Sequence, residues 1–173
     1  VELELEDPVT APTPTAAHEQ LTSDDPSTHG SRVGSDRENA HILDDIKHIK
    51  GIKFGHLNIC SISNKIDQLR ILMANKALDV LLVTETWLTD THTDEEIAIP
   101  GYNLERSDRL NKKGGGLCLY ISDRFLYERL EPDQNHSTLS TIETIWIHFK
   151  IPKSRPITIG GVYRPPSASV QDS

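Results

Sequence analysis

Residues 52–88 read IKFGHLNICSISNKIDQLRILMANKALDVLLVTETWL and contain three successive hydrophobic patterns. The first extends from Ile52 to Ile59 and predicts a strand with a small irregularity at Gly55. The last, DVLLVTET, is almost entirely apolar, which is typical of a strand that is covered on both faces.

The segment between these two strands has the periodicity of an amphipathic helix. Its apolar residues recur at helical spacing, and Ser61 or Ser63 fits the N-cap position. The apolar face consists of Ile62, Ile66, Leu69, Leu72 and Met73. A strand, a helix and a second strand in so short a stretch predict a βαβ unit with parallel strands.

The second half of the chain has the patterns of antiparallel strands. Three segments fit strands separated by polar loops: GGLCLYIS (115–122), TIETIWIHFK (141–150) and PITIGGVYR (156–164). In the middle one, Ile145, Ile147 and Phe149 alternate with Thr144, Trp146 and His148. We therefore expect an α/β fold in which a mixed sheet combines one βαβ unit with antiparallel hairpins.

Residues 1–48 differ in composition from the rest of the 173-residue chain. They are rich in Pro, Ser, Thr and acidic residues and lack a periodic apolar pattern, so we expect a disordered acidic leader, with the folded domain at 49–173. The leader serves as a solvated spacer or as an acidic interaction tail. Residues 1–45 carry a net charge of −9, whereas the whole chain carries −8, so residues 46–173 are close to neutral. The acidic pI of about 5.4 therefore does not argue against a polyanionic substrate.

Cysteine and histidine usage excludes several classes of protein. Cys60 and Cys118 lie far apart, without a CxxC pair or a signal peptide, which favours a reduced intracellular setting over a disulfide scaffold or zinc finger. The eight histidines form neither HxH nor HExxH, so a histidine-based metal site is not expected. No apolar run is long enough to span a membrane.

Two polar residues are predicted to lie at one sheet edge. Asn58 closes the first strand and Glu85 the second, and the carboxyl ends of parallel strands share the edge where open α/β sheets bind ligands. A carboxylate and an amide there can supply oxygen ligands to a hard cation. Alternatively, Glu85 is a solvated strand end or a helix cap, and Asn58 is a turn residue.

Further candidates come from two other segments. In GVYRPPS, Tyr163 and Arg164 end the last strand and can both hold phosphate oxygens, although edge packing of the tyrosine is equally compatible. In DRLNKKGGGL, Arg109, Lys112 and Lys113 precede three glycines. This is not a P-loop, because the GK[ST] ending is absent. It is either a flexible turn with solvated lysines or a contact to a nucleic-acid backbone.

Six ordered blocks of the sequence resemble one family. They are LNICSISNKID, DVLLVTETWL, IPGYNLERSDR, KKGGGLCLYIS, IETIWI and GVYRPPS. In order and spacing, they resemble the amino-terminal endonuclease domain of non-LTR, jockey-like retrotransposon polyproteins, within the endonuclease/exonuclease/phosphatase superfamily. The resemblance covers about residues 50 to 167. It implies a four-layered α/β sandwich like that of deoxyribonuclease I, of which this chain supplies about the first half.

The resemblance also implies roles for individual residues. Asn58 would orient the attacked phosphate, the water or the shell of the metal, Glu85 would bind Mg²⁺ or Mn²⁺, and Tyr163 would contact the scissile phosphate or the nucleophile. The implied reaction is hydrolysis of a DNA phosphodiester by an in-line water. DNA would be the partner, in the nucleus, and a reverse transcriptase domain would lie downstream in the polyprotein.

The sequence departs from the family pattern after the YRPP block. The GDFN block, a later aspartate and a terminal Asp-His pair are not found, and Asp172 does not replace them. We therefore expect a truncated domain with little or no magnesium-dependent nicking of supercoiled plasmid on its own. Two alternatives stay open: another phosphoesterase of the superfamily, acting on inositol phosphates or lipids, or a remnant that at most binds nucleic acid or a protein.

Overall fold

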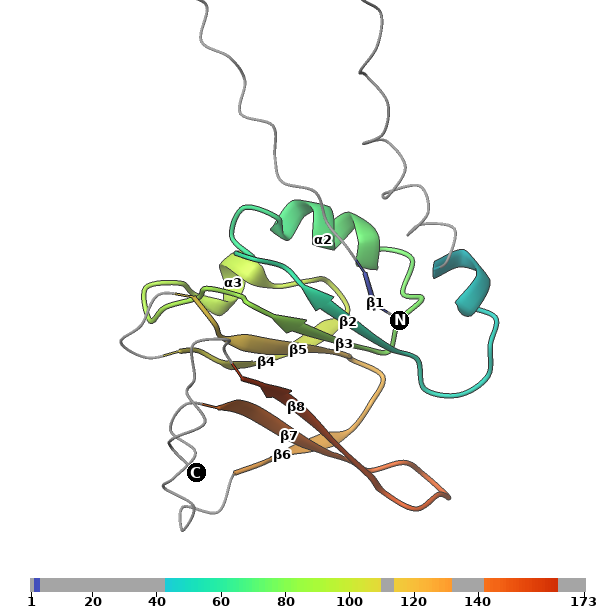
Figure 1. Ribbon diagram of the computed structural model, residues 1–173. Helices are drawn as coiled ribbons and strands as arrows, with labels where there is room; N and C mark the ends of the chain where they lie inside the picture. The colour runs from blue at the N-terminus through green and yellow to red at the C-terminus, as the bar shows by residue number, and fades with distance from the viewer. Residues whose placement is uncertain (1, 4–42, 110–113, 132–141, 165–173) are drawn as a thin grey trace, which may run out of the picture.

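The computed structural model describes residues 2–3, 43–109, 114–131 and 142–164, and these form three layers (Figure 1). Helices cover one face of a five-stranded sheet with the order β1-β2-β3-β5-β4, and a three-stranded sheet with the order β6-β7-β8 packs on the other face. The elements are β1 (Glu2–Leu3), β2 (Phe54–Asn58), α2 (Ile66–Met73), β3 (Val80–Thr84), α3 (Asp94–Ile97), β4 (Tyr102–Ser107), β5 (Leu117–Ser122), β6 (Tyr127–Leu130), β7 (Glu143–Phe149) and β8 (Ile157–Tyr163). The larger sheet is mixed and the smaller one is antiparallel, so the α/β class and the mixed sheet are confirmed.

The predicted βαβ unit is present. β2 and β3 pair in parallel from Phe54 opposite Val80 to Asn58 opposite Thr84. The α2 helix between them buries the expected face, including Leu69. Its predicted serine caps are wrong, because the helix begins after Lys65, which makes no side-chain cap hydrogen bond. The ammonium group of Lys65 instead donates to the carbonyl of Ile59 at 2.9 Å and ties the helix start to the end of β2.

The expected irregularity at Gly55 is also wrong. Gly55 pairs in register with Leu81 and no residue is inserted. A Cβ at this position would lie 2.6 Å from Leu78 Cδ1, so glycine is needed there for close packing rather than for a bulge. The regular strand places Leu57 on the buried face and Phe54 on the opposite one, where it is 41% exposed.

The apolar strand β3 contributes to both cores, as predicted. Leu81 and Val83 belong to the core beneath the helices, whereas Val80 faces the core between the two sheets. In β7, Ile145, Ile147 and Phe149 are all buried in the second core, which confirms the alternation predicted for this strand.

The described parts of residues 1–48 are ordered, in contrast to the disordered leader that the sequence predicts. Glu2–Leu3 form β1, which pairs in parallel with β2. Residues 43–46 are helical, and Leu43 is fully buried in the core beneath the helices. The folded domain therefore starts before residue 49, because Leu43 finds an apolar partner surface that its local sequence does not reveal. The rest of the leader lies outside the described residues. No helix in the described part of the chain has the length and apolar character needed to cross a bilayer.

Candidate functional site at the carboxyl edge of β2 and β3

The predicted edge residues Asn58 and Glu85 come from neighbouring strands. Asn58 is paired with Thr84, the residue before Glu85. The two chains continue side by side beyond the strands, because the Ile59 amide donates to the Thr84 carbonyl at 3.0 Å and the Ser61 amide donates to the Glu85 carbonyl at 2.9 Å. Asn58 is exposed and Glu85 is half-buried. The parallel pairing thus brings both residues to one edge, as the sequence predicts.

The Glu85 carboxylate is held through one of its oxygens. Oε2 accepts hydrogen bonds from the Trp87 indole N–H at 2.6 Å and from the Gly115 amide at 2.9 Å. Oε1 makes no hydrogen bond or ion pair with any residue that the structure describes. One oxygen therefore fixes the carboxylate, while the other can accept a cation.

The backbone of glycines 114–116 is hydrogen-bonded to the segment that carries Glu85. All three have left-handed φ values, between 73° and 81°. The Trp87 amide donates to the Gly115 carbonyl at 2.9 Å, and the Thr86 amide donates to the Gly116 carbonyl at 3.3 Å. The amides of Gly115 and Gly116 are both used by carboxylates. This segment is therefore a structural support for the site rather than a free phosphate-binding loop.

Glu143 is a second carboxylate at this edge, and sequence reasoning missed it. Its Oε2 accepts from the Gly116 amide at 3.1 Å, and its Oε1 lies 3.4 Å from Arg109 Nε. The side chains of Glu143 and Arg109 are only 10% and 14% exposed. The signal was available, because the alternation that turns Ile145 inward in β7 also turns Glu143 inward. A carboxylate on a buried face needs partners, and here they are an amide and a guanidinium.

Burial of Glu143 raises the pKa of its carboxyl group above the ordinary value of 4.5. The Gly116 amide and the Arg109 guanidinium oppose this shift, and the negative charge of Glu85 adds to it. Arg109 compensates Glu143, whereas Glu85 forms no ion pair with any residue in the described part of the chain.

Tyr163 joins the same end of the molecule through the smaller sheet. It is paired with Glu143 across β7 and β8, and it packs half-buried against the core between the sheets. A continuous set of contacts thus leads from Glu85 through Gly115, Gly116 and Glu143 to Tyr163. The arrows of β2, β3 and β8 all point to the left in Figure 1.

The predicted nucleic-acid contacts lie in different environments. Arg109 is largely buried and paired with Glu143, so its guanidinium is not displayed to a ligand as a solvated loop residue would be. Arg164 is exposed directly after β8. Lys112 and Lys113 lie outside the described residues. Contact of these four residues with DNA stays a prediction.

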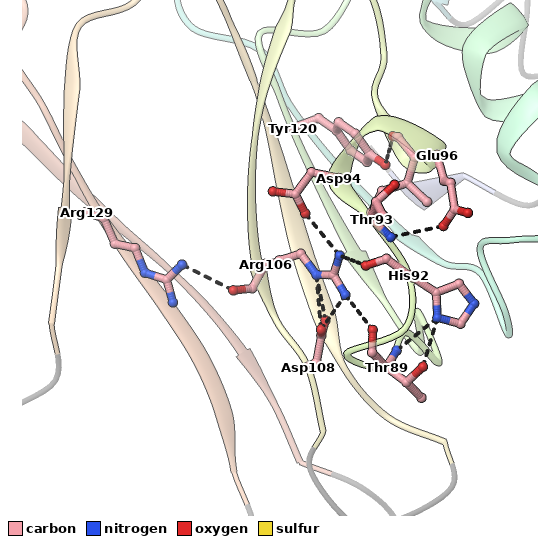
Figure 2. A network of polar contacts seen from close by, with 10 residues as sticks. Thr89, His92, Thr93, Asp94, Glu96, Arg106, Asp108, Tyr120 and Arg129 are labelled. Atoms are coloured by element: carbon pink, nitrogen blue, oxygen red, sulfur yellow. Dashed lines mark hydrogen bonds and ion pairs between the residues drawn. The ribbon is translucent and has the colours of Figure 1, made fainter.

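Arg106, on β4, is a further cation near this edge, and its neighbourhood is shown in Figure 2. Its guanidinium donates to the Asp108 carboxylate, to Asp94 and to the carbonyls of Thr89 and His92. All its N–H groups are used in this way. Asp108 is the main cause of the raised pKa of Arg106. Arg106 therefore holds the 89–94 loop on β4 and is not free for phosphate.

Backbone strain gathers at the same edge. Cys60, Ser61, Glu85 and Trp87 all have left-handed φ values, between 48° and 83°. Such conformations cost on the order of 1–3 kcal/mol for a residue other than glycine and cluster at functional sites.

The donor set fits a hard cation that keeps most of its own water. Within residues 2–3, 43–109, 114–131 and 142–164, no three His, Cys, Asp or Glu side chains lie close enough together to hold an ion. Mg²⁺ commonly uses only one or two carboxylates, together with waters and substrate phosphates. The open oxygen of Glu85 at a half-exposed edge satisfies that requirement.

Replacing Glu143 by glutamine is expected to flatten the pH dependence of stability. The raised pKa means that the folded state binds the proton of Glu143 more tightly than the unfolded state does. Its stabilising contribution is therefore complete below pH 4.5 and is lost as the pH rises through the higher folded-state pKa. Urea unfolding at a series of pH values from about 4 to 8 will measure the slope. An unchanged slope in Glu143→Gln would contradict the assignment.

No protein-family model and no curated protein matches this sequence.

Proposed function

We propose that the chain is part of a metal-dependent DNA endonuclease domain of the endonuclease/exonuclease/phosphatase superfamily, of the kind found in non-LTR retrotransposons. The observation that carries the proposal is the convergence of Asn58, Glu85 and Tyr163 on one end of both sheets. More than 100 residues separate Asn58 from Tyr163 in the sequence, so a shared position at this edge supports a shared role.

In this proposal Glu85 holds Mg²⁺ or Mn²⁺ through its open oxygen. The bound ion supplies positive charge that stabilises the phosphodiester as negative charge develops on it. Asn58 donates from its amide to the phosphate or the attacking water, and the Tyr163 hydroxyl contacts the same phosphate. The exposed Arg164, with Lys112 and Lys113, binds the DNA backbone. Arg109 acts indirectly, by keeping Glu143 charged and in place.

The finer fold in this proposal is the four-layered sandwich of deoxyribonuclease I, with a helical layer over the smaller sheet. The outer face of that sheet supports it, because large apolar residues are exposed there. Leu130, Trp146 and Val162 are 36%, 40% and 53% exposed. Apolar residues gathered on one sheet face are typical of a surface that a further layer covers. A downstream reverse transcriptase and a nuclear site of action belong to the same proposal.

The proposal predicts that divalent-cation binding depends on Glu85. Mn²⁺ binding, measured by electron paramagnetic resonance or calorimetry, is expected to weaken at least about 10-fold in Glu85→Gln, since a charged oxygen ligand is replaced by a neutral one. Cation-dependent affinity for a short duplex is expected to fall in parallel. Binding is the primary readout, because the expected nicking activity is low.

Glu128→Gln is the matched control. It removes the same charge from β6, where Glu128 is exposed and paired with Lys150 at 3.1 Å. The control should bind Mn²⁺ and DNA like the parent chain. Equal weakening in both variants would show only a general charge effect, and unchanged binding in Glu85→Gln would overturn the proposed site.

A further inference from the structure

Trp87 is an aromatic residue in an unusual position. Its neighbours Thr86 and Leu88 are buried, whereas Trp87 is 40% exposed and belongs to neither hydrophobic core. Its φ of 56° lies in the left-handed region, where glycine and asparagine are favoured and a bulky side chain is rare. Tryptophan therefore occupies a backbone conformation that disfavours bulky side chains. Packing in a hydrophobic core does not explain its presence at this position.

Both the side chain and the backbone of Trp87 are held by hydrogen bonds. Its N–H donates to Glu85 Oε2 at 2.6 Å, and the backbone amide of Trp87 donates to the Gly115 carbonyl at 2.9 Å. Orienting Glu85 uses only the N–H at the edge of the ring. The 40% exposure of so large an apolar residue needs another explanation, and its fixed orientation lowers the entropic cost of binding a ligand there.

We propose that the exposed Trp87 indole binds a nucleobase of the DNA by stacking, beside the phosphodiester that Glu85 serves. This inference rests on the proposed function. A base and its phosphate belong to one nucleotide, and Trp87 is hydrogen-bonded to the carboxylate assigned to that phosphate. Since every base has a π-face and the indole N–H is already occupied by Glu85, the interaction tolerates any sequence. Trp87 is thus a positioning residue, which sets the place of the strand relative to Glu85.

The chain offers a matched fluorescence experiment, because it contains two tryptophans, Trp87 and Trp146. Both are 40% exposed, and Trp146 lies on the outer face of the smaller sheet. Trp146→Phe leaves Trp87 as the single reporter, and Trp87→Phe leaves Trp146. The probe is a short DNA duplex with a single-stranded end, added in Ca²⁺ to prevent cleavage. Saturable quenching is expected in Trp146→Phe and little change in Trp87→Phe.

A second measurement locates the stacked base. Trp87→Leu is expected to bind the probe about 10-fold more weakly than the parent chain, whereas Trp87→Phe, which keeps a ring, should lose less. An abasic nucleotide is then moved along the probe. At one position, removal of the base should abolish the difference between the parent chain and Trp87→Leu, as coupling between two partners requires. Pyrimidines and purines at that position should bind alike.

The outcomes separate the two proposals. Binding that depends on Glu85 but leaves Trp87 fluorescence unchanged, with Trp87→Leu as tight as the parent chain, would overturn the stacking role and leave the proposed function standing. No binding of the probe by the folded parent chain would overturn the proposed function together with this inference. The fluorescence measurement does not require Trp87→Leu to fold, since it is made on a chain that retains Trp87.

Discussion

Gly116→Ala is expected to destabilise the fold by roughly 2–5 kcal/mol, the sum of a backbone and a packing effect. Gly116 has a φ of 81°, which costs an L-residue with a Cβ about 1–2 kcal/mol. The new Cβ would also lie 2.5 Å from Thr86 Oγ1, on a fully buried side chain that cannot move into solvent. Such overpacking typically adds about 1–3 kcal/mol. The midpoint of urea or guanidinium unfolding measures the total.

The neighbouring Gly114 supplies the matched control. Its φ is also 81°, but the nearest described atom to a Cβ there would be Trp87 Nε1 at 3.6 Å, which is an ordinary contact. Gly114→Ala should therefore show only the backbone effect of about 1–2 kcal/mol. Adding Thr86→Ala should recover part of the stability of Gly116→Ala, because Oγ1 is the atom in the way and makes no hydrogen bond to any described residue. Equal destabilisation by the two glycine variants would show that the Thr86 contact is not limiting.

The effect of Gly116→Ala extends to the site. The Gly116 amide holds Glu143 and the adjacent Gly115 amide holds Glu85. Displacing this segment from Thr86 disturbs both carboxylates at once. The glycines at 114–116 are therefore needed for the conformation that holds both carboxylates, and they are more than a flexible turn.

The elements that were predicted correctly are those whose pattern is local. The βαβ unit at 54–88 follows from periodicity within one stretch, and parallel pairing of its strands follows from chain connectivity. That pairing also placed Asn58 beside Thr84 and so brought Glu85 to the same edge. The inward face of β7 followed from simple alternation.

The parts that were missed depend on contacts between distant segments. The sequence groups Arg109 with Lys112 and Lys113 as a candidate for contact with a nucleic-acid backbone, because its partner, Glu143, is 34 positions away. Leu43 looked like part of the leader because its core lies elsewhere in the sequence. In contrast, α3 had a local signal that was not used: Thr93 and Glu96 form a capping box, with the Thr93 amide donating to Glu96 Oε2 at 3.0 Å.

Arg106→Met is expected to destabilise the fold by up to about 3–5 kcal/mol, because it leaves the largely buried carboxylate of Asp108 without its partner. Arg106 and Asp108 are each only 16% exposed. Loss of the guanidinium also removes one hydrogen-bond donor from each of the Thr89 and His92 carbonyls, and the 89–94 loop loses its attachment to β4. Arg106→Lys should recover little, since one ammonium group cannot replace a planar fork that serves four partners. Denaturant unfolding measures both variants.

Arg129→Met is the control for Arg106→Met, because Arg129 is more exposed and pairs with Glu105 at 3.1 Å. Figure 2 shows Arg129 at the edge of the same network, where it donates to the Arg106 carbonyl. Arg129→Met should cost no more than about 1 kcal/mol. The double variant Arg106→Met/Asp108→Leu tests the cause, since removing both charges should be less harmful than removing one. If it is no more stable than Arg106→Met, the uncompensated Asp108 charge is not the source of the loss. Mn²⁺ binding by the folded fraction of Arg106→Met should stay near that of the parent chain, because Glu85 is held by Trp87 and Gly115 rather than by the 89–94 loop.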